Sequence, residues 1–185
     1  FIGTSTKTLA IAGNLGGAGS IDMSGGSLLH VMNLGGATNT IGTLTTAAVA
    51  SVINYNRAGN QTVFGSANYR NLTVSGGSTK SVQGNITVNT SLTLTLGFAQ
   101  LGTNNITIAN GATISAGSVT AMVITDGTGQ LMKTFPAGGS AFTYPVGDLT
   151  GSNDYSPTTI TYTANSTIRT IGVRVTDAKH PSDAT

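Results

Sequence analysis

The sequence predicts an all-β protein in which Gly-, Thr- and Asn-rich coils stack into a β-solenoid. Composition is the first observation: the chain has 185 residues with 26 Gly, charged residues make up only 8%, and Glu is absent. Gly, β-branched Thr and turn-forming Asn all disfavour the interior of a helix, whereas Thr, Val and Ile suit strands. A hydrophobic fraction of 38% argues against disorder, so short strands joined by tight turns are expected.

A near-repetition is the second observation. The line "NITVNTSLTL" begins at Asn85 and "NITIANGATI" begins at Asn105, an offset of 20 residues. A period of about 20 residues is typical of one solenoid coil, which cannot bury its own apolar face and must be covered by the next coil. We therefore expect the second line to lie on the first, with Gly and Asn at the corners. The pairs aligned by the offset include Ile86 with Ile106, Thr87 with Thr107, Val88 with Ile108, Leu92 with Ala112, Thr93 with Thr113 and Leu94 with Ile114.

Alternation of apolar and polar residues is the third observation, because a period of two indicates a strand with one buried face. It extends over most of the first 120 residues, where pairs of Gly separate the alternating runs. We interpret residues 1–120 as the solenoid-like repeat region. Strands are predicted around Leu9–Ala12, Ser20–Met23, Leu28–Leu34, Ser51–Tyr55, Gln61–Phe64 and Asn71–Val74.

The pattern changes near Thr120, and we place a domain boundary there. In "AMVITDGTGQLMKTF", Asp126-Gly127 is a hairpin signal between two strands, and three of the four Pro residues, Pro136, Pro145 and Pro157, follow within a short span. Residues 121–185 are predicted to form a small antiparallel β-sandwich-like module, which the end of the chain could truncate. Its expected inward positions are Ile160, Tyr162, Ile168, Ile171, Val173 and Val175.

Charge and composition limit the classes of partner. The formal net charge is +2, but the eight Lys and Arg residues are scattered, so no nucleic-acid-binding patch is expected. No apolar run approaches the roughly 20 residues of a membrane span. Cys is absent, which excludes disulfides and a thiol nucleophile. The chain starts at Phe1 without a signal peptide, and we interpret it as a mature protein or a piece of a longer one.

Two stretches resemble the repeat regions of large secreted surface proteins of Bacteroidetes. The first is "INYNRAGNQTVFGSANYRNLTVSGGSTKSVQGNITVNTSLTL" from Ile53, and the second is "LMKTFPAGGSAFTYPVGDLTGSNDYSPTTITYT" from Leu131, with "YPVG", "YSP" and a trailing "VRVTDAKHP". Proteins of this kind are commonly exported by the type IX route and serve as cell-surface adhesins or filament components. The resemblance therefore implies an extracellular location on a bacterial surface. The C-terminal sorting domain of such proteins is not evident in this sequence.

Metal-binding candidates are weak, and no cofactor is predicted. "GGAGSIDMS" from Gly16 is similar to a calcium-binding nonapeptide, but Asp22 falls one position late and would point to the other face. Asp148 and Asp154 flank a Gly-Ser-Asn turn and could supply oxygen ligands to calcium. Asx turns explain these acids equally well, so we expect no metal, with Asp148 and Asp154 as the candidates if one binds.

Catalytic residues are not predicted. His30 and His180 are the only histidines, and although Asp177 and Asp183 lie near His180, "DAKHPSD" has the composition of a polar connector. No nucleophile motif, phosphate-binding loop or pair of Glu residues is present. Glycoside hydrolysis would have to depend on two of six scattered Asp residues. The sequence favours a protein that is not an enzyme.

Two functions remain, and they differ in class. The first is a structural or adhesive protein that contacts copies of itself, or adjacent repeats of one polypeptide, through an assembly edge containing Phe1, Ile2, Leu9 and Ile11, because the ends of a solenoid present unpaired strands. A β-rich module at the other end could cover the last coil or offer a strand. The second is a carbohydrate-binding module that binds surface polysaccharide, with calcium as its candidate ion. Its ligand platform would be Tyr55, Tyr69, Tyr144 and Tyr155, if they lie exposed on one face.

Overall fold

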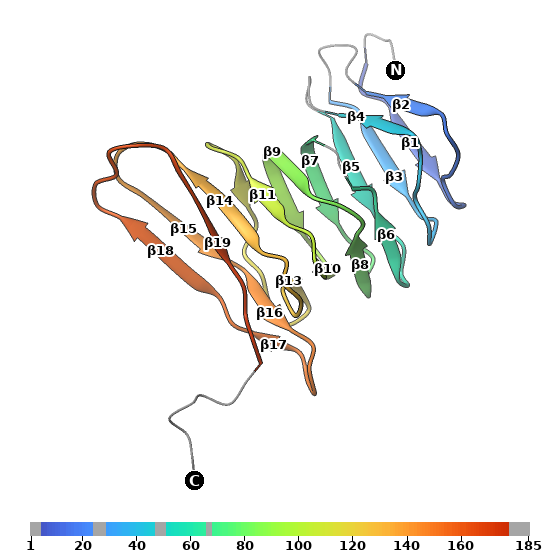
Figure 1. The fold of residues 1–185 in the computed structure, drawn as a ribbon. Helices are drawn as coiled ribbons and strands as arrows, with labels where there is room; N and C mark the ends of the chain where they lie inside the picture. Colours follow the sequence, from blue (N-terminus) through green and yellow to red (C-terminus); the bar gives the residue numbers. More distant parts are fainter. Residues whose placement is uncertain (1–4, 24–28, 47–50, 66–67, 178–185) are drawn as a thin grey trace.

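The computed structural model describes residues 5–23, 29–46, 51–65 and 68–177. These residues form an all-β solenoid of about six turns, as predicted, and contain no helix (Figure 1). Accordingly, no described helix could cross a membrane. The coils follow one another along the axis of the stack from the N-terminal end to the C-terminal end (Figure 1).

Most strands belong to two sheets. The nine-stranded sheet contains β1 (Thr8–Ile11), β3 (Val31–Leu34), β5 (Val52–Tyr55), β7 (Asn68–Val74), β9 (Ile86–Leu94), β11 (Ile106–Ile108), β12 (Thr113–Ile114), β14 (Leu131–Phe135) and β19 (Arg169–Val173). The six-stranded sheet contains β6 (Gln61–Val63), β8 (Thr79–Val82), β10 (Gly97–Gln100), β13 (Ala121–Ile124), β16 (Val146–Asp148) and β17 (Asp154–Tyr155). Two further pairs join β2 (Ser20–Asp22) to β4 (Thr43–Thr45), and β15 (Ser140–Tyr144) to β18 (Thr158–Tyr162).

One parallel ladder of the nine-stranded sheet starts at the N-terminal end of the stack, and we call it the first ladder. It runs from β1 through β3 and β5 into the second halves of β7 and β9, and ends at β12. The first halves of β7 and β9 pair in a different register, with an irregularity between Tyr69 and Asn71. They continue instead to β11 and β14.

The repeated lines do lie on one another. Ile86, Thr87 and Val88 pair with Ile106, Thr107 and Ile108, as the offset of 20 residues predicts. The asparagine that starts each line forms the corner: the Asn105 N–H donates to Asn85 Oδ1 at 2.8 Å, and the Gln130 N–H donates to Asn105 Oδ1 at 2.8 Å. Asn therefore recurs at this corner because its side chain accepts from the main chain of the next coil.

The second half of the predicted alignment is wrong. Leu92 pairs with Ile114 and not with Ala112, and Thr93 pairs with Thr73 of the preceding coil and not with Thr113. The cause is a turn at Ala109–Ala112, closed by the Ala112 N–H donating to Ala109 O at 3.1 Å. This turn places two more residues between the paired strands than the preceding coil has.

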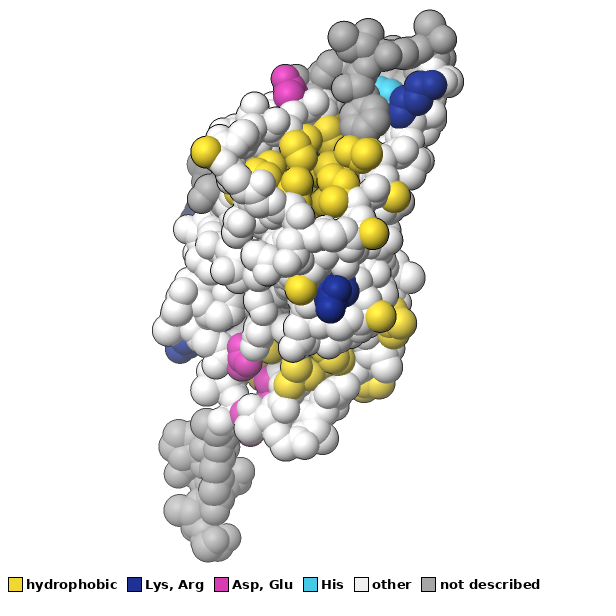
Figure 2. Space-filling view, turned by 90° about the vertical axis from the view of Figure 1, so that its right-hand side faces the viewer, with side chains coloured by type: hydrophobic (Ala, Val, Ile, Leu, Met, Phe, Trp, Pro, Cys, Tyr) yellow, Lys and Arg dark blue, Asp and Glu magenta, His cyan; other side chains and the backbone are white. Residues whose placement is uncertain are grey.

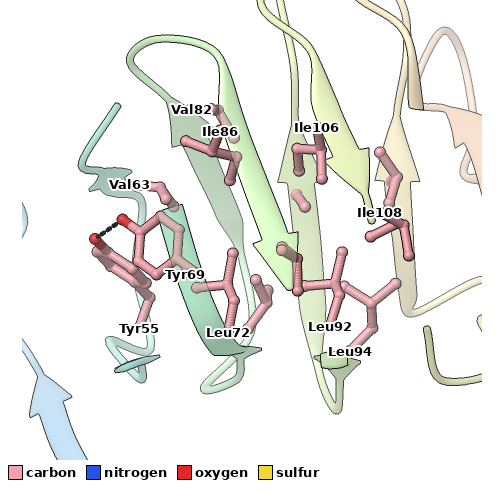
Figure 3. Close-up of a cluster of buried hydrophobic side chains, with 14 of the residues drawn as sticks. Tyr55, Val63, Tyr69, Leu72, Val82, Ile86, Leu92, Leu94, Ile106 and Ile108 are labelled. Carbon is pink, nitrogen blue, oxygen red and sulfur yellow. Dashed lines mark hydrogen bonds between the residues drawn. The ribbon is translucent and has the colours of Figure 1, made fainter. Parts of the chain in front are cut away.

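The interior is a continuous column of apolar side chains (Figure 3). In several strands the residues of one alternating set are buried, as in β5 and β14, where the burial pattern has a period of two. Burial of one such side chain stabilises a protein by about 1.5–3 kcal/mol, so the column is the main stabilising feature. Fully buried members include Met32, Leu34, Ile53, Leu72, Val88, Leu92, Ile106, Ile108, Leu131 and Phe135.

Two buried tyrosines close a hydrogen-bonded ring inside this column. The hydroxyl groups of Tyr55 and Tyr69 lie 2.8 Å apart (Figure 3). The Phe64 N–H donates to the Tyr55 hydroxyl at 3.0 Å, and the Tyr69 hydroxyl donates to Phe64 O at 2.7 Å. Because the Tyr69 proton is used on Phe64 O, the Tyr55 hydroxyl donates to the Tyr69 oxygen. Burial raises the pKa of Tyr55 to about 12 and the pKa of Tyr69 well above its usual value.

The free energy of unfolding should therefore fall as the pH rises from about 10 to about 12. The unfolded chain loses the Tyr55 proton near pH 10, whereas folded Tyr55 keeps it until its pKa of about 12. Raising the pH through this range therefore favours the unfolded chain. Above pH 12, Tyr55 alone should have lowered the free energy of unfolding by roughly 3 kcal/mol. Denaturant titrations followed by circular dichroism, with tyrosinate absorbance recorded in parallel, would measure this. Ionisation of Tyr55 near pH 10 in a still-folded chain would contradict it.

The region after residue 120 continues both sheets and then adds antiparallel strands. β13 pairs in parallel with β10, and β14 pairs in parallel with β11. The predicted hairpin at Asp126-Gly127 is wrong, because β13 and β14 belong to different sheets and the turn is a corner stacked on the Gly102 corner of the previous coil. Antiparallel pairs then join β14 to β19, β15 to β18 and β16 to β17.

Most of the predicted inward residues in this region do pack against the core. Ile160, Tyr162, Ile171, Val173 and Val175 are partly buried against it. Ile168 is the exception, with 64% of its surface exposed. It lies before the start of β19, and the alternation of the strand does not extend back to it.

The two ends of the stack differ. At the C-terminal end, β19 and β17 cover the last parallel strands of the two large sheets in antiparallel fashion. At the N-terminal end, β1 is the edge strand, and no described strand pairs with its outer side. The apolar residues of this first coil are only half-buried, namely Leu9, Ile11, Leu15 and Ile21. Hydrophobic side chains are visible on this end of the molecule (Figure 2).

Candidate functional site

A groove lies between β12 and β15. It has a volume of about 570 Å³, within the range of ligand-binding clefts. One side comes from residues 110–112 of the turn and from β12, the other from β15, and Tyr155 also lines it. We call it the β12–β15 groove. Its lining residues are Asn110–Ala116, Lys133, Pro136, Ser140–Thr143, Pro145 and Tyr155.

Two strands supply the sides of the groove. Consecutive residues line the groove on both sides: Thr113–Ile114 of β12 with Ser115–Ala116 after its end, and Ser140–Thr143 of β15. β12 pairs only with β9, and β15 only with β18. Within the described chain, no strand lies between them.

The hydrogen bonds of β12 show which main-chain groups face the groove. The Ser115 N–H donates to Leu92 O at 2.9 Å, and Ile114 is the register partner of Leu92. In a parallel ladder this arrangement points the N–H and C=O of Ile114 away from β9, toward the groove. The groove therefore offers a main-chain donor and acceptor to a ligand.

Lys133 also lines the groove. Its Nζ donates to Ala109 O at 2.7 Å and to Ala112 O at 2.6 Å, which fastens the turn of one wall. The same Nζ lies 5.2 Å from the centre of the Phe142 ring in the other wall. Burial lowers the pKa of Lys133. Because two carbonyl groups and an aromatic ring already hold the ammonium group, a ligand need not carry a compensating negative charge.

Lys80 has a similar place at another corner. Its side chain is fully buried, and its Nζ donates to Arg57 O at 2.5 Å, Gly59 O at 3.0 Å and Gly77 O at 2.6 Å. Burial, with a smaller contribution from the Arg57 charge, lowers the pKa of Lys80 to about 8. On sequence alone, Lys80 and Lys133 count only as scattered basic residues. Their position in the strand could have predicted their burial, because each lies two residues from a buried apolar residue and therefore points to the same face.

The predicted assembly edge coincides in part with β1. Leu9 and Ile11 point toward the core, and the exposed feature is the main chain. The Val31 N–H donates to Lys7 O at 2.9 Å, and the Gly35 N–H donates to Ile11 O at 2.7 Å, so the alternate residues Thr8 and Ala10 direct their main-chain groups outward. Phe1 and Ile2 lie outside the described residues.

The metal candidates occupy turns. Asp148 is buried, and its Oδ1 accepts the Thr150 N–H at 2.8 Å, the Asx arrangement that the sequence allowed. Asp154 is the cross-strand partner of Asp148 but is exposed, as is Asp22 in β2. A second hollow brings Asp148 near Asp126 and Asp177, a grouping that sequence reasoning missed. Among the described residues, no set of three His, Cys, Asp or Glu is placed to hold a metal ion.

The expectation of an exposed tyrosine platform is wrong for three of its four members. Tyr55, Tyr69 and Tyr144 have no exposed surface, and the Tyr144 hydroxyl donates to Ile171 O at 3.1 Å. Burial raises the pKa of Tyr144 well above its usual value. Of the four, Tyr155 alone is partly exposed, and it lines the β12–β15 groove. The buried tyrosines share the inward phase of their strands, a signal that the sequence displays.

Of the two histidines, His30 lies among the described residues. His30 is buried, and its Nδ1 accepts the Lys7 N–H at 3.2 Å, which links the first two coils. Asp177 is exposed, while His180 and Asp183 lie outside the described residues.

Comparison of the chain with known protein families, curated proteins and solved structures finds no match. The geometry of the strand edges and of the groove is therefore the basis on which function can be inferred.

Proposed function

We propose that this chain is a non-enzymatic, extracellular structural or adhesive element that makes head-to-tail contacts through β-strands. The neighbour is either another copy or an adjacent repeat of the same polypeptide. The single observation that carries the proposal is that, at the N-terminal end of the stack, no described strand pairs with the outer edge of β1. There β1 directs main-chain groups of Thr8 and Ala10 outward, and the apolar side chains of the first coil are half-buried.

The physical reason is that an unpaired strand edge beside a half-buried apolar surface tends to pair with another strand unless a further element covers it. A salt-bridged interface is disfavoured, because only 8% of the residues are charged. The C-terminal end of the stack is different from the N-terminal end, so contacts between them are heterologous. Contacts of that kind do not close on themselves unless a rotation closes a ring, and an open chain of copies is the expected product.

Sedimentation velocity over a wide range of protein concentration would test the proposal. The expected result is a concentration-dependent series of linear oligomers, visible as filaments by electron microscopy. Ala10→Pro removes an outward N–H of β1 without touching the hydrogen bonds to β3, so it should weaken association while leaving the melting temperature nearly unchanged. Ala10→Val keeps the N–H and is the matched control. A chain that stays monomeric at every concentration, or forms only a closed dimer, would contradict the proposal.

Carbohydrate binding is the second candidate, now confined to the β12–β15 groove. Tyr155 and Phe142 are the aromatic residues of its lining, and the exposed Thr113 and Thr143 carry hydroxyl groups. Burial of the other three tyrosines leaves this candidate with less support than strand contacts have. Titration calorimetry with neutral oligosaccharides would test it, and loss of heat in Tyr155→Ala is the expected signature.

A further inference from the structure

We propose that Asn110 is a self-modifying site, at which the Gly111 main-chain nitrogen displaces the side-chain amide and a carboxylate takes its place. The reaction is deamidation through a cyclic imide and needs no enzyme. Asn110 lines the β12–β15 groove, so the product would carry its new charge there. The reaction is independent of head-to-tail contacts and of any ligand in the groove.

The covalent step balances with water as the only co-reactant. The Gly111 nitrogen attacks Cγ of Asn110, and the new bond between them closes a five-membered ring. The Cγ–Nδ2 bond breaks, and the proton of the Gly111 nitrogen leaves with Nδ2 as ammonia. Water then opens the ring at one of its two carbonyl groups, which gives either aspartate or isoaspartate at position 110. Nothing is oxidised or reduced.

The neighbour of Asn110 is the first reason. Asn110-Gly111 is the one Asn-Gly pair in the sequence. Because Gly has no Cβ, no side chain crowds the nitrogen that must approach Cγ. A Cβ at residue 111 would meet no atom within 4 Å, so the surroundings of this residue are open as well. An attack between groups already adjacent in the chain gains much of its rate from that proximity.

The turn that contains the pair is the second reason. Asn110 and Gly111 are its central residues, between Ala109 and Ala112, and the Gly111 φ of 76° fits the third position of a type II turn. The Ala112 N–H closes the turn, whereas no hydrogen bond of the Gly111 N–H is found within the described chain. The nitrogen that reacts is therefore not held by another group.

The side chain of Asn110 is the third reason. It is exposed, and among the described residues it makes no hydrogen bond that the reaction would have to break. Other asparagine side chains are held. Asn71 Nδ2 donates to Ser51 O at 3.0 Å. Asn85 Oδ1 accepts the Asn105 N–H at 2.8 Å, and a bulky Ile follows Asn85 in the sequence.

The charge of Lys133 is the fourth reason. Its Nζ donates to Ala109 O at 2.7 Å and to Ala112 O at 2.6 Å, the carbonyl groups on either side of the reacting pair. The attacking nitrogen must lose its proton, and a nearby positive charge favours the anion that forms. Among the described residues that line the groove, Lys133 is the only charged one. The product carboxylate would therefore give the groove its first negative charge.

Ageing of the purified full chain tests the proposal. In warm, mildly alkaline buffer the chain should release one equivalent of ammonia, and peptide mapping by mass spectrometry should place the loss at Asn110, as a mixture of aspartate and isoaspartate. The rate should rise with pH, because the attacking nitrogen must be deprotonated. Asn85 is the internal control and should keep its amide while Asn110 is converted. Absence of ammonia release, an Asn110 amide that outlasts that of Asn85, or a rate independent of pH would overturn the proposal.

Asn110→Gln is the matched variant. Gln keeps a neutral amide at the same exposed position, but attack by the nitrogen of residue 111 would have to close a six-membered ring, which forms more slowly. The variant should therefore release ammonia at least about tenfold more slowly than the unchanged chain. Its melting temperature reports whether it folds. Equal rates of release would show that the ammonia comes from another residue.

The isoaspartate product should also loosen the turn. Isoaspartate lengthens the main chain of the turn by one methylene group, which moves Ala109 O and Ala112 O relative to Lys133 Nζ. A fraction enriched in isoaspartate should melt about 2–4 °C below the unmodified chain. Asn110→Asp gains the charge without the methylene group and should melt near the unmodified chain. Equal melting of the isoaspartate fraction and the unmodified chain would overturn this part of the proposal.

Discussion

Replacement of Lys80 by Met is expected to lower the free energy of unfolding by about 3 kcal/mol. Met has nearly the length of Lys and fills its space, but it has no donor for Arg57 O, Gly59 O and Gly77 O, which all bind Nζ in the folded protein. Relief of the buried charge offsets part of the loss, which is why the expected cost is not larger. Denaturant unfolding followed by circular dichroism gives the value.

Lys7→Met is the matched control, because the Lys7 side chain is exposed and only its main chain binds neighbouring residues. It should change the free energy of unfolding by less than about 0.5 kcal/mol. Equal effects of the two substitutions would show that Lys80 does not fasten its corner.

Gly127→Ala is expected to destabilise the fold by a comparable amount, about 3 kcal/mol. A Cβ at residue 127 would overlap the main-chain carbonyl of Gly102, which stacks beneath it in the previous coil. Neither backbone can give way easily, because the Gly129 N–H also donates to Gly102 O at 2.9 Å and holds the two corners together. For a chain of this size the melting temperature should fall by roughly 10 °C.

Gly19→Ala is the matched control for this substitution. A Cβ at residue 19 meets no atom within 4 Å, and its backbone is not in the left-handed region. It should be neutral or slightly stabilising, since Ala restricts the unfolded chain. A loss of stability at Gly19 equal to that at Gly127 would show that corner stacking is not the cause.

The solenoid could be predicted because its physical cause is written in the sequence. Many strands alternate in period two, and the coil period repeats both the apolar residues and the corner Asn85 and Asn105. The same alternation also predicts which single polar residues are buried. Lys80, Lys133 and Tyr55 each fall on the buried face of their strand, although composition alone would place them on the surface.

The groove could not be predicted, because it forms where two strands that are close in the fold do not pair with each other. Nothing in the residues of β15 says that it pairs with β18 and leaves the edge of β12 open. The antiparallel strands after residue 120 were expected, whereas their continuity with the solenoid sheets was not. Pairing over long sequence distance is decided by competition between edges, which a local pattern does not record.

Amide hydrogen exchange as a function of protein concentration tests most directly the claim that copies join through the outer edge of β1. Thr8 and Ala10 both direct their amides to that edge. We expect both amides to exchange rapidly in dilute solution and to become protected together as the oligomers form. The Gln83 amide, which already donates to Val63 O within the stack, should not change. Oligomers in which the amides of Thr8 and Ala10 both exchange as fast as in the monomer would contradict the account.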